Sequence, residues 1–500
     1  MSEKFIMAID QGTTSTRAMI FDRSGKIINK AQEKFTQIYP QPGWVEHNPE
    51  EIWESTKTVM SSVLQGIKID AQDIAGIGIT NQRETTLIWD RNTGEPIFNA
   101  IVWQCRRTTD MCSKLKQRGL EEKFQQKTGL LLDPYFSGTK IKWILDHVEG
   151  ARKKAKKGDL LFGTIDSWLI WKLSGENKHV TDYTNASRTL IYNILDLEWD
   201  EELLNILEIP PEILPEVQSS SSILAYTDPT NFFGCKKPIA GAAGDQQAAT
   251  FAQACFKKGM IKSTYGTGAF MLINTGSEPF ISENSLLTTI GWGLEGEINY
   301  CLEGSIFNAG SAIQWLVDEL ELLSDPADSE YFAQKVENTD GVYVVPAFTG
   351  LGAPYWEPRA RGMIVGITRA TTRNHIIRAT LEAIGYQSQD LLKAMQEDTD
   401  IEIKEIRVDG GAAQNNFLLQ FLADISGKVV QRPVNTETTA AGSAYLAGLA
   451  VDYWDDLQEI TKLREVDKDF EPEITQETRN KFLRDWDNAV ESALKWGDLN

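Results

Sequence analysis

Two glycine-threonine turns lie about 250 residues apart in this chain, and each is followed by an apolar run typical of a strand. The turn at residues 12–13 precedes the run 18–21, and the turn at 266–267 precedes the run 270–273. Because the chain has 500 residues, this spacing suggests two related halves rather than a solenoid, whose repeats are only about 20–50 residues long. Two unrelated hairpins are the alternative, since the matching segments are short.

Apolar extended segments alternate with amphipathic helical segments along the chain. Residues 5–9 and 16–22 predict a hairpin, which a β-rich stretch after Gly25 extends to a meander. Apolar periodicity predicts helices at 49–65, 310–323, 374–395 and 440–452, and short apolar runs predict strands at 74–79, 342–345 and 406–408. This alternation predicts α/β layers in which helices pack on sheets.

The charge balance argues against several classes of partner. The chain has 71 acidic and 50 basic residues, a formal net charge of −21, which disfavours binding to nucleic-acid phosphates and to anionic membrane surfaces. Hydrophobic residues make up 41% of the chain and charged residues 24%, as in folded globular proteins. We therefore expect no nucleic-acid partner and no membrane insertion.

Five widely spaced cysteines indicate a reducing compartment. They form no CxxC pair and have no neighbouring histidine, so neither a disulfide framework nor a zinc site is supported. The first residues lack the apolar core of a signal peptide, and no run of 18 or more apolar residues follows. The expected location is the cytoplasm.

The segment Asp10–Ser15 joins a carboxylate at a predicted strand end to a turn of small, hydroxyl-bearing residues. Hydroxyls and backbone N–H groups in such a turn can surround phosphate oxygens, and its glycine allows a ligand to approach closely. Asp10 is a candidate to hold Mg²⁺ directly or through water. A polar hairpin turn without a ligand is the alternative. The candidate phosphate contacts are Thr13, Thr14, Ser15 and Arg17.

The second turn, in the segment Ser263–Ala269, places Thr267 where the first turn places Thr13. Two such turns on facing sides of a cleft would hold a polyphosphate from both sides. The chain contains neither the GxxxxGK[ST] phosphate loop nor the combined GxGxxG, HRD and DFG motifs of protein kinases. Those two phosphoryl-transfer architectures are therefore disfavoured.

Asp245 stands among small residues in the segment Gly241–Ala248, directly after an apolar, strand-like stretch. A carboxylate in so tight a setting is a candidate general base for a hydroxyl nucleophile. The alternative is an N-cap for a helix that begins at Gln246, and the two roles are compatible.

Two further segments carry polar groups at strand ends. Arg83 and Glu84 follow the predicted strand 74–79, and they are costly to bury unless they hydrogen-bond to each other or to a ligand. As a donor beside an acceptor, they suit the neighbouring hydroxyls of a polyol. The segment Val408–Asn416 predicts a strand, a Gly-Gly turn and a helix, where a flat ring can lie against the backbone.

The segments AIDQGTTSTRA (8–18), 135–147 and 362–382 resemble signatures of the FGGY carbohydrate kinases, and the resemblance covers essentially the whole chain. It implies an α/β fold with two RNase H-like domains of the actin/Hsp70/hexokinase ATPase type and an interdomain cleft. The implied domains are 1–250, with the glycerol site and the first phosphate site, and 251–500, with the nucleotide site. The resemblance also favours related halves over unrelated hairpins.

The family's site residues carry over position by position. The implied glycerol pocket consists of Arg83, Glu84, Trp103, Tyr135, Asp245, Gln246 and Phe270. The implied nucleotide contacts are Thr13, Thr14, Ser15 and Arg17 on one side, with Thr267, Gly310, Gln314, Gly411 and Asn415 on the other. Asp10 and Asp245 are the implied Mg²⁺ residues. For Trp103 and Phe270, burial in the core is the alternative.

The activity that the resemblance implies is ATP-dependent phosphorylation of glycerol to sn-glycerol 3-phosphate, the first step of glycerol catabolism. ATP is the co-substrate, Mg²⁺ neutralises the polyphosphate, and Asp245 accepts the proton of the terminal hydroxyl during in-line transfer. A kinase of pentuloses or other polyols is the alternative within this enzyme class. An ATP-driven binding or assembly protein of the actin or Hsp70 kind is the alternative from another class.

Departures from the family pattern concern regulation. Many Gram-positive members that act on glycerol carry a histidine that is phosphorylated by the phosphotransferase-system carrier protein, and here Asn231 stands at that position. Asparagine cannot accept the phosphoryl group, so we expect no activation by this route. Other members bind fructose 1,6-bisphosphate through a glycine and an arginine, whereas this chain has Gly234 and Lys236. Lysine lacks the bidentate fork of arginine, so inhibition by fructose 1,6-bisphosphate is left open. The resemblance further implies a homodimer or homotetramer.

Overall fold

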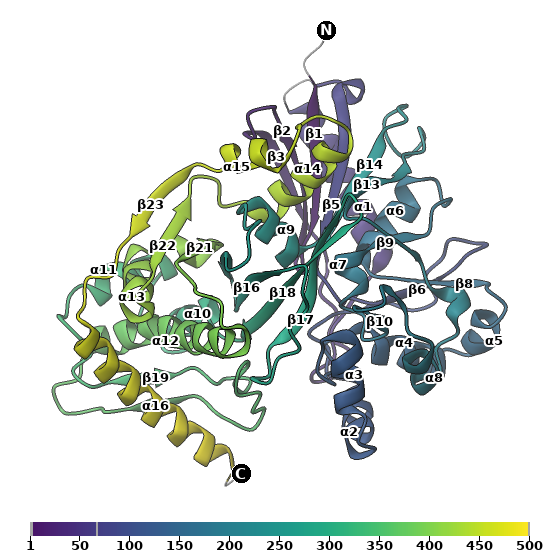
Figure 1. Ribbon diagram of the computed structural model, residues 1–500. Helices are drawn as coiled ribbons and strands as arrows, with labels where there is room; N and C mark the ends of the chain where they lie inside the picture. Colours follow the sequence, from purple (N-terminus) through teal and green to yellow (C-terminus); the bar gives the residue numbers. More distant parts are fainter. Residues whose placement is uncertain (1–3, 67–68, 499–500) are drawn as a thin grey trace.

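The computed structural model describes residues 4–66 and 69–498 (Figure 1). Within them, a mixed sheet of thirteen strands runs through the molecule, and helices pack on both of its faces. The predicted α/β layers are therefore confirmed. In the same part of the chain, no helix combines the length and the apolar character that crossing a bilayer requires.

The first half of the sheet has the order β3 (Ile27–Lys34), β2 (Ser15–Phe21), β1 (Phe5–Gln11), β5 (Ile74–Asn81) and β14 (Pro238–Gly244). The strands β1, β2 and β3 are antiparallel neighbours, which confirms the predicted meander. The strand β5 pairs in parallel with both β1 and β14.

The second half repeats this arrangement. Its order is β18 (Glu297–Ile306), β16 (Ala269–Gly276), β15 (Ile261–Tyr265), β21 (Glu405–Asp409) and β22 (Val429–Pro433). The first three are antiparallel neighbours, and β21 pairs in parallel with β15 and β22. The two halves are therefore related in fold, and the two glycine-threonine turns occupy equivalent places, each between the first two strands of its half.

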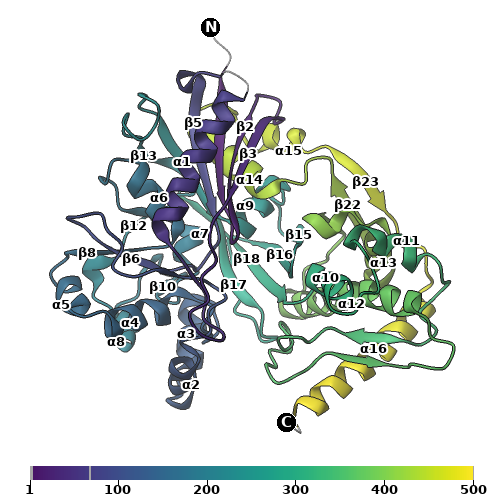
Figure 2. The ribbon, with the colours of Figure 1, turned by 180° about the vertical axis from the view of Figure 1, so that it is seen from behind.

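Two strands join the halves in the middle of the sheet. β13 (Ser221–Tyr226) pairs antiparallel with β14, and β17 (Leu287–Leu294) pairs antiparallel with β18. They meet each other in parallel through Ser221 and Leu294. At the far edge, β23 (Val466–Phe470) pairs antiparallel with β22, so the sheet is continuous from one lobe of the molecule to the other (Figure 2).

The helix α1 (Pro49–Gln65) has the predicted bounds. Asn48 caps its first turn by accepting a hydrogen bond from the Glu50 N–H at 3.0 Å. Its buried apolar stripe packs against β2 and β3, on the face of the sheet to which Met7 and Ile9 point (Figure 2). The capping residue and the apolar periodicity together explain why this segment is a helix.

The helix α14 (Thr438–Ala450) belongs to the second half in sequence but packs on the first half of the sheet, beside α9 (Asp245–Ala252). It covers the face opposite α1, as the alternation of side chains along β1 requires. The backbones approach very closely there. A Cβ on Gly78 would lie 2.1 Å from the Ser443 carbonyl oxygen, and one on Gly442 would lie 1.9 Å from that of Ala248. Glycine is therefore required at both positions.

The helix α10 (Gly310–Asp318) is shorter than the predicted helix 310–323. Glu321 has a φ of 51°, in the left-handed region, so the chain cannot continue as a helix through this point. Leu322 and Leu323 still pack on the core of the second half. The apolar periodicity therefore predicted the burial correctly and the helix length incorrectly.

The remaining elements surround this framework. The helices are α2 (Thr109–Gln117), α3 (Glu121–Thr128), α4 (Ser137–His147), α5 (Ala151–Ala155), α6 (Ile165–Leu173), α7 (Tyr183–Ala186), α8 (Glu201–Leu207), α11 (Ser329–Ala333), α12 (Arg373–Thr399), α13 (Asn416–Ser426), α15 (Leu457–Leu463) and α16 (Gln476–Asp498), with 3-10 turns η1 (Ala71–Asp73), η2 (Pro211–Ile213), η3 (Pro326–Asp328) and η4 (Gly411–Gln414). The short strands are β4 (Glu46–His47), β6 (Leu87–Asp90), β7 (Ala100–Ile101), β8 (Leu160–Gly163), β9 (Val180–Asp182), β10 (Tyr192–Asn193), β11 (Glu198–Trp199), β12 (Glu216–Gln218), β19 (Tyr343–Val345) and β20 (Met363–Val365).

Candidate active site

Glutamine side chains donate hydrogen bonds to the backbone carbonyls of the first glycine-threonine turn. The carbonyl oxygen of Gly12 accepts hydrogen bonds from Gln11 Nε2 at 2.8 Å and Gln82 Nε2 at 3.2 Å. The carbonyl oxygen of Thr13 accepts one from Gln37 Nε2 at 3.0 Å. These bonds, together with the one from the Gly12 N–H to the Ser15 carbonyl at 3.0 Å, hold the backbone of the turn in place, as a preformed phosphate site requires.

A buried histidine connects two of these glutamines. His47 Nε2 lies 2.9 Å from Gln37 Oε1, and His47 Nδ1 lies 3.3 Å from Gln82 Nε2. Since Gln82 Nε2 can only donate, the consistent tautomer carries its proton on Nε2. Burial lowers the pKa of His47 to about 4, so the ring stays neutral near pH 7 and keeps both bonds.

The four phosphate candidates of this turn differ in their surroundings. Thr14 is exposed, and the Thr13 hydroxyl accepts a bond from Trp103 Nε1 at 3.0 Å. The buried Ser15 hydroxyl accepts a bond from Gln32 Nε2 at 2.8 Å. Arg17 Nη1 bonds to Glu437 Oε2 at 2.8 Å and lies 4.0 Å from Asp10 Oδ2. Thr13, Thr14 and Arg17 are therefore at least partly accessible to a ligand, whereas Ser15 is buried.

Asp10 is buried at the end of β1, and its carboxylate can serve as a metal ligand. Its Oδ2 accepts a hydrogen bond from Thr439 Oγ1 at 3.0 Å. Burial raises its pKa, an effect that Arg17 opposes and the nearby Asp245 carboxylate reinforces. Within the described ranges no group of three or more histidine, cysteine or acidic side chains is arranged around one point. One or two carboxylates suit Mg²⁺, which usually keeps several waters and binds substrate phosphates as its other ligands.

Asp245 lies at the start of α9, but not as the predicted N-cap. The helix begins at Asp245 itself and Gly244 occupies the capping position, so the prediction of a helix beginning at Gln246 is wrong by one residue. Asp245 Oδ1 accepts a bond from the Gln246 N–H at 2.7 Å and lies 3.1 Å from Arg83 Nε. Its side chain is 31% exposed, so a ligand can reach the carboxylate.

Arg83 and Glu84 are adjacent in the chain, but each binds mainly to another residue. Their closest charged atoms, Arg83 Nε and Glu84 Oε1, are 3.8 Å apart. Arg83 instead binds Glu303 of β18 through Nη1 and Nη2, and Glu84 Oε1 accepts a bond from Arg188 Nε at 2.6 Å. Arg188 Nη2 also donates to Glu303 Oε1 at 2.9 Å. These four side chains, which we call the charge ring, are at most 2% exposed and connect the two halves.

The pKa values of the two carboxyl groups in the charge ring are shifted in opposite directions. Burial would raise the pKa of Glu303, but the guanidinium groups of Arg188 and Arg83 outweigh it, so the pKa lies below 4.5. Burial also raises the pKa of Glu84, and there the same two arginines offset it only in part. Glu303 is therefore the ionised partner of both arginines.

Two buried lysines support residues of the predicted glycerol pocket. Lys140 Nζ donates to the Glu84 carbonyl at 3.1 Å, and Glu84 has a φ of 57°, a conformation that costs energy for a residue with a side chain. Lys262 Nζ donates to Gln246 Oε1 at 2.6 Å, which leaves the Gln246 NH₂ group available to a ligand. Sequence reasoning missed both lysines, and also Arg188 and Glu303. A charged residue inside an apolar strand was the available signal for Lys262 and Glu303.

Three aromatic rings lie next to one another beside Arg83 of the charge ring. The Trp103 ring lies 5.6 Å from the Tyr135 ring and 6.4 Å from the Phe270 ring, measured between centroids. Tyr135 Oη accepts a bond from Arg83 Nη2 at 3.3 Å, and the Arg83 guanidinium lies 5.8 Å from the centroid of Phe270. All three rings are partly exposed. Trp103 and Phe270 are not among the buried core residues, which disfavours the alternative of core burial, and their place in the glycerol site stays a prediction.

The predicted nucleotide residues of the second half line one cavity of about 790 Å³. Gln314 Nε2 donates to Asp318 Oδ1 at 2.8 Å, which leaves its carbonyl oxygen as an acceptor. Asn415 caps α13 by accepting from the Leu418 N–H at 2.9 Å, and its Nδ2 donates to Ser329 at 3.1 Å. One acceptor position and one N–H of its amide are thus used by the protein, and its second N–H remains available. The predicted residues on the cavity wall are Thr267, Gly310, Gln314, Gly411 and Asn415.

We predict that Gly411→Ala weakens ATP binding without destabilising the fold. A Cβ on Gly411 meets no protein atom within 4 Å among the described residues, so the methyl group would enter the cavity instead. The KM for ATP should rise about tenfold or more, with an unchanged melting temperature. Steady-state kinetics and thermal unfolding measure the two effects.

The matched control is Gly310→Ala on the same cavity wall. A Cβ there would lie 2.5 Å from the Gly266 carbonyl oxygen, so this variant should lose stability as well as affinity. A Gly411→Ala protein with an unchanged KM for ATP would place the nucleotide elsewhere.

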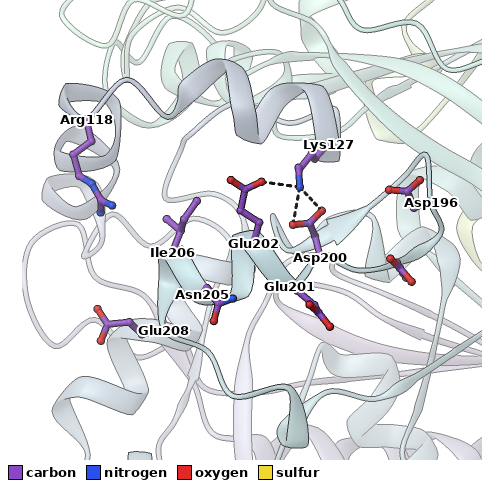
Figure 3. A pocket seen from close by; sticks show the side chains of 10 residues that line it. Arg118, Lys127, Asp196, Asp200, Glu201, Glu202, Asn205, Ile206 and Glu208 are labelled. Carbon is purple, nitrogen blue, oxygen red and sulfur yellow. Dashed lines mark hydrogen bonds and ion pairs between the residues drawn. The ribbon is translucent and has the colours of Figure 1, made fainter.

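A second, shallower depression of about 820 Å³ lies in the first half of the molecule, away from these residues (Figure 3). It is lined mainly by carboxylates near α8, and Lys127 binds Asp200 and Glu202 across it at 2.8 and 3.0 Å. None of the predicted site residues lines it. Its acidic groups would repel a polyphosphate, so we do not assign it to the active site.

Comparisons with known proteins show the family to which the chain belongs. The FGGY family of carbohydrate kinases matches through its N-terminal domain over residues 5–252 and through its C-terminal domain over residues 261–451. Glycerol kinase from Halothermothrix orenii is 67% identical over 99% of each chain, and glycerol kinase from Bacillus subtilis is 59% identical over 98% of this chain and 99% of that one. The structure of Plasmodium falciparum glycerol kinase with ADP is similar with a TM-score of 0.93 at 38% identity, over 98% of each chain. Xylulose kinase from Lactobacillus acidophilus shares the fold, with a TM-score of 0.88 at 24% identity over 99% of this chain and all of that one. The chain belongs to the FGGY family of carbohydrate kinases.

Proposed function

We propose that this protein is a glycerol kinase, which transfers the terminal phosphoryl group of ATP to glycerol and forms sn-glycerol 3-phosphate. The observation that carries the proposal is the cluster of Arg83, Asp245 and Gln246 beside the three partly exposed aromatic rings of Trp103, Tyr135 and Phe270. Polar groups of this kind suit the hydroxyls of a short polyol, and the rings suit its carbon chain. Full-length similarity to several glycerol kinases supports the choice of substrate.

In this proposal Asp245 is the general base. Its carboxylate is accessible at the N-terminus of α9 and lies beside Arg83, which keeps the substrate hydroxyl and the base in the same pocket. Gln246, oriented by Lys262, donates its NH₂ group to a second hydroxyl. The two glycine-threonine turns hold the polyphosphate from opposite sides, which places the terminal phosphoryl group in line with the polyol.

Mg²⁺ is the metal that these residues suit, with Asp10 and Asp245 as the groups to hold it. When bound, it supplies positive charge that neutralises the polyphosphate. The remaining charge compensation comes from Arg17 and from the hydroxyls and N–H groups of the turns, which act locally although the whole chain carries −21. Closure of the two halves would exclude water, which otherwise competes with glycerol for the phosphoryl group.

The other features of the protein follow the same proposal. The two kinase domains are 1–250 and 251–500, the assembly is a homodimer or homotetramer, and the enzyme acts in the cytoplasm. Asn231, whose Nδ2 donates to the Lys172 carbonyl at 2.7 Å, carries no group that the phosphotransferase-system carrier protein could phosphorylate. The carrier protein should therefore leave the activity unchanged.

A substrate panel tests the proposed function. Glycerol, dihydroxyacetone, xylulose and ribulose are each incubated with Mg-ATP, and ADP release is measured with a coupled assay. We expect the highest kcat/KM for glycerol. A higher value for xylulose or ribulose would make the protein a pentulose kinase, and ADP release that does not respond to any of the four would favour an ATP-driven binding or assembly protein.

A further inference from the structure

Trp103 is connected to the first glycine-threonine turn by two separate routes. Its indole N–H donates directly to the Thr13 hydroxyl at 3.0 Å. Its backbone N–H donates to Thr85 Oγ1 at 3.3 Å, and Thr85 Oγ1 donates to Gln82 Oε1 at 3.0 Å. Gln82 Nε2 in turn donates to the Gly12 carbonyl at 3.2 Å. A wall of the polyol pocket and the phosphate turn therefore form one hydrogen-bonded unit.

The direct bond has a fixed direction. An indole N–H can only donate, so the Thr13 oxygen must be the acceptor. The Thr13 hydroxyl then keeps its own proton for a second partner, on the side away from the indole. The Thr13 carbonyl oxygen accepts a hydrogen bond from Gln37, so it is not the partner of the Thr13 hydroxyl proton. Thr13 is partly exposed, so a phosphate oxygen at the mouth of the turn can accept it.

The position of the Trp103 ring depends on the polyol pocket. Its ring contacts Tyr135 and Phe270 edge to face, and the residue is only partly buried, so part of its side chain is accessible to a ligand. A polyol packed against this side would restrict the ring. Because the indole ring is rigid, restricting the ring also restricts its N–H group. The N–H group in turn restricts the Thr13 hydroxyl to which it donates.

We propose that Trp103 couples the two substrate sites: a polyol against its ring fixes the indole N–H, which fixes the Thr13 hydroxyl as a donor to the phosphoryl group that is transferred. This inference rests on the proposed function, since it requires a polyol in one site and a nucleotide in the other. Coupling of this kind is reciprocal, so glycerol tightens nucleotide binding by the same factor by which the nucleotide tightens glycerol binding.

The variant Trp103→Phe tests the proposal, because phenylalanine keeps an aromatic wall and loses the N–H. The measured quantity is the coupling factor, which is the ratio of the Kd values for a non-hydrolysable ATP analogue without and with saturating glycerol, from calorimetry. We expect a factor of about five in the wild type, the size of effect expected for one net hydrogen bond, and a factor close to one in Trp103→Phe. Trp199→Phe is the matched control, since Trp199 Nε1 makes a similar 2.9 Å bond to the Pro215 carbonyl outside the site.

Variants of Thr13 separate coupling from a structural effect. Thr13→Val removes the acceptor and should lose the coupling to the same extent, with no further loss when it is combined with Trp103→Phe. Thr13→Ser keeps the hydroxyl and should restore it. Coupling that persists in Trp103→Phe, or that falls equally in Trp199→Phe, would overturn the inference.

The outcomes also distinguish this inference from the proposed function. A wild-type protein that phosphorylates glycerol but shows no effect of glycerol on analogue binding contradicts the coupling alone. A wild-type protein that does not phosphorylate glycerol contradicts the proposed function, and the coupling with it.

Discussion

Replacing Asp245 by asparagine is expected to lower the kcat for glycerol phosphorylation by about 10²- to 10⁴-fold, the usual contribution of a general base. Asparagine has nearly the same shape and can still accept the bond from the Gln246 N–H. It cannot take a proton from the glycerol hydroxyl, and it no longer carries the negative charge that faces Arg83 Nε at 3.1 Å. The loss should therefore appear in turnover rather than in folding.

Two measurements make this prediction specific. The Kd for a non-hydrolysable ATP analogue should change little, because the nucleotide cavity of the second half does not include Asp245. The control Asp110→Asn makes the same chemical change on the exposed side of α2 and should leave kcat unaltered. Near-normal turnover of Asp245→Asn would remove this residue from the role of base.

The second large effect is expected for Glu303→Gln, which removes the negative charge that two buried arginines share. Arg83 and Arg188 would keep their charges in a place that is at most 2% exposed, and breaking a buried ion pair in this way costs about 3–5 kcal/mol of unfolding free energy. Glycerol affinity should fall as well, because Arg83 loses the partner that orients its guanidinium toward the pocket.

Urea unfolding of the wild type and of Glu303→Gln measures the stability difference. Since the pKa of Glu303 is held below 4.5 in the folded protein, the ionised form contributes its full stabilisation above pH 4.5, and the contribution falls at lower pH. Glu491→Gln, which breaks an exposed 3.0 Å pair with Lys495 on α16, should cost only about 0.3–0.5 kcal/mol. Equal losses in the two variants would mean that the charge ring contributes no more than a surface pair.

Local sequence signals predicted the elements that local interactions determine. The meander, α1 and the strand-turn-strand around Thr267 all depend on residues close in the chain, and their predicted positions agree with the structure. The spacing of the two glycine-threonine turns suggested the relation between the halves, and the resemblance to a known family favoured it. The roles of the individual site residues remain predictions, although the structure brings those of the second half together around one cavity.

The sequence did not predict which charged residues pair with partners far away in the chain. Arg83 and Glu84 are neighbours in the chain, but the φ of 57° at Glu84 turns their side chains toward different partners. The partner of Arg83 is 220 residues away, and no local pattern identifies it. Arg188, Lys140 and Lys262 were missed for the same reason, because each supports a site residue from an element that meets it only in the folded protein.

The close packing of α14 on the first half of the sheet limits how the two lobes can move. At Gly78 and Gly442 the backbones already touch, so the helix has no room to slide along the strands or to tilt into them. A closure of the two halves is therefore expected to leave α14 seated on β5 and α9, so that this helix moves with the first half of the sheet although it belongs to the second half in sequence.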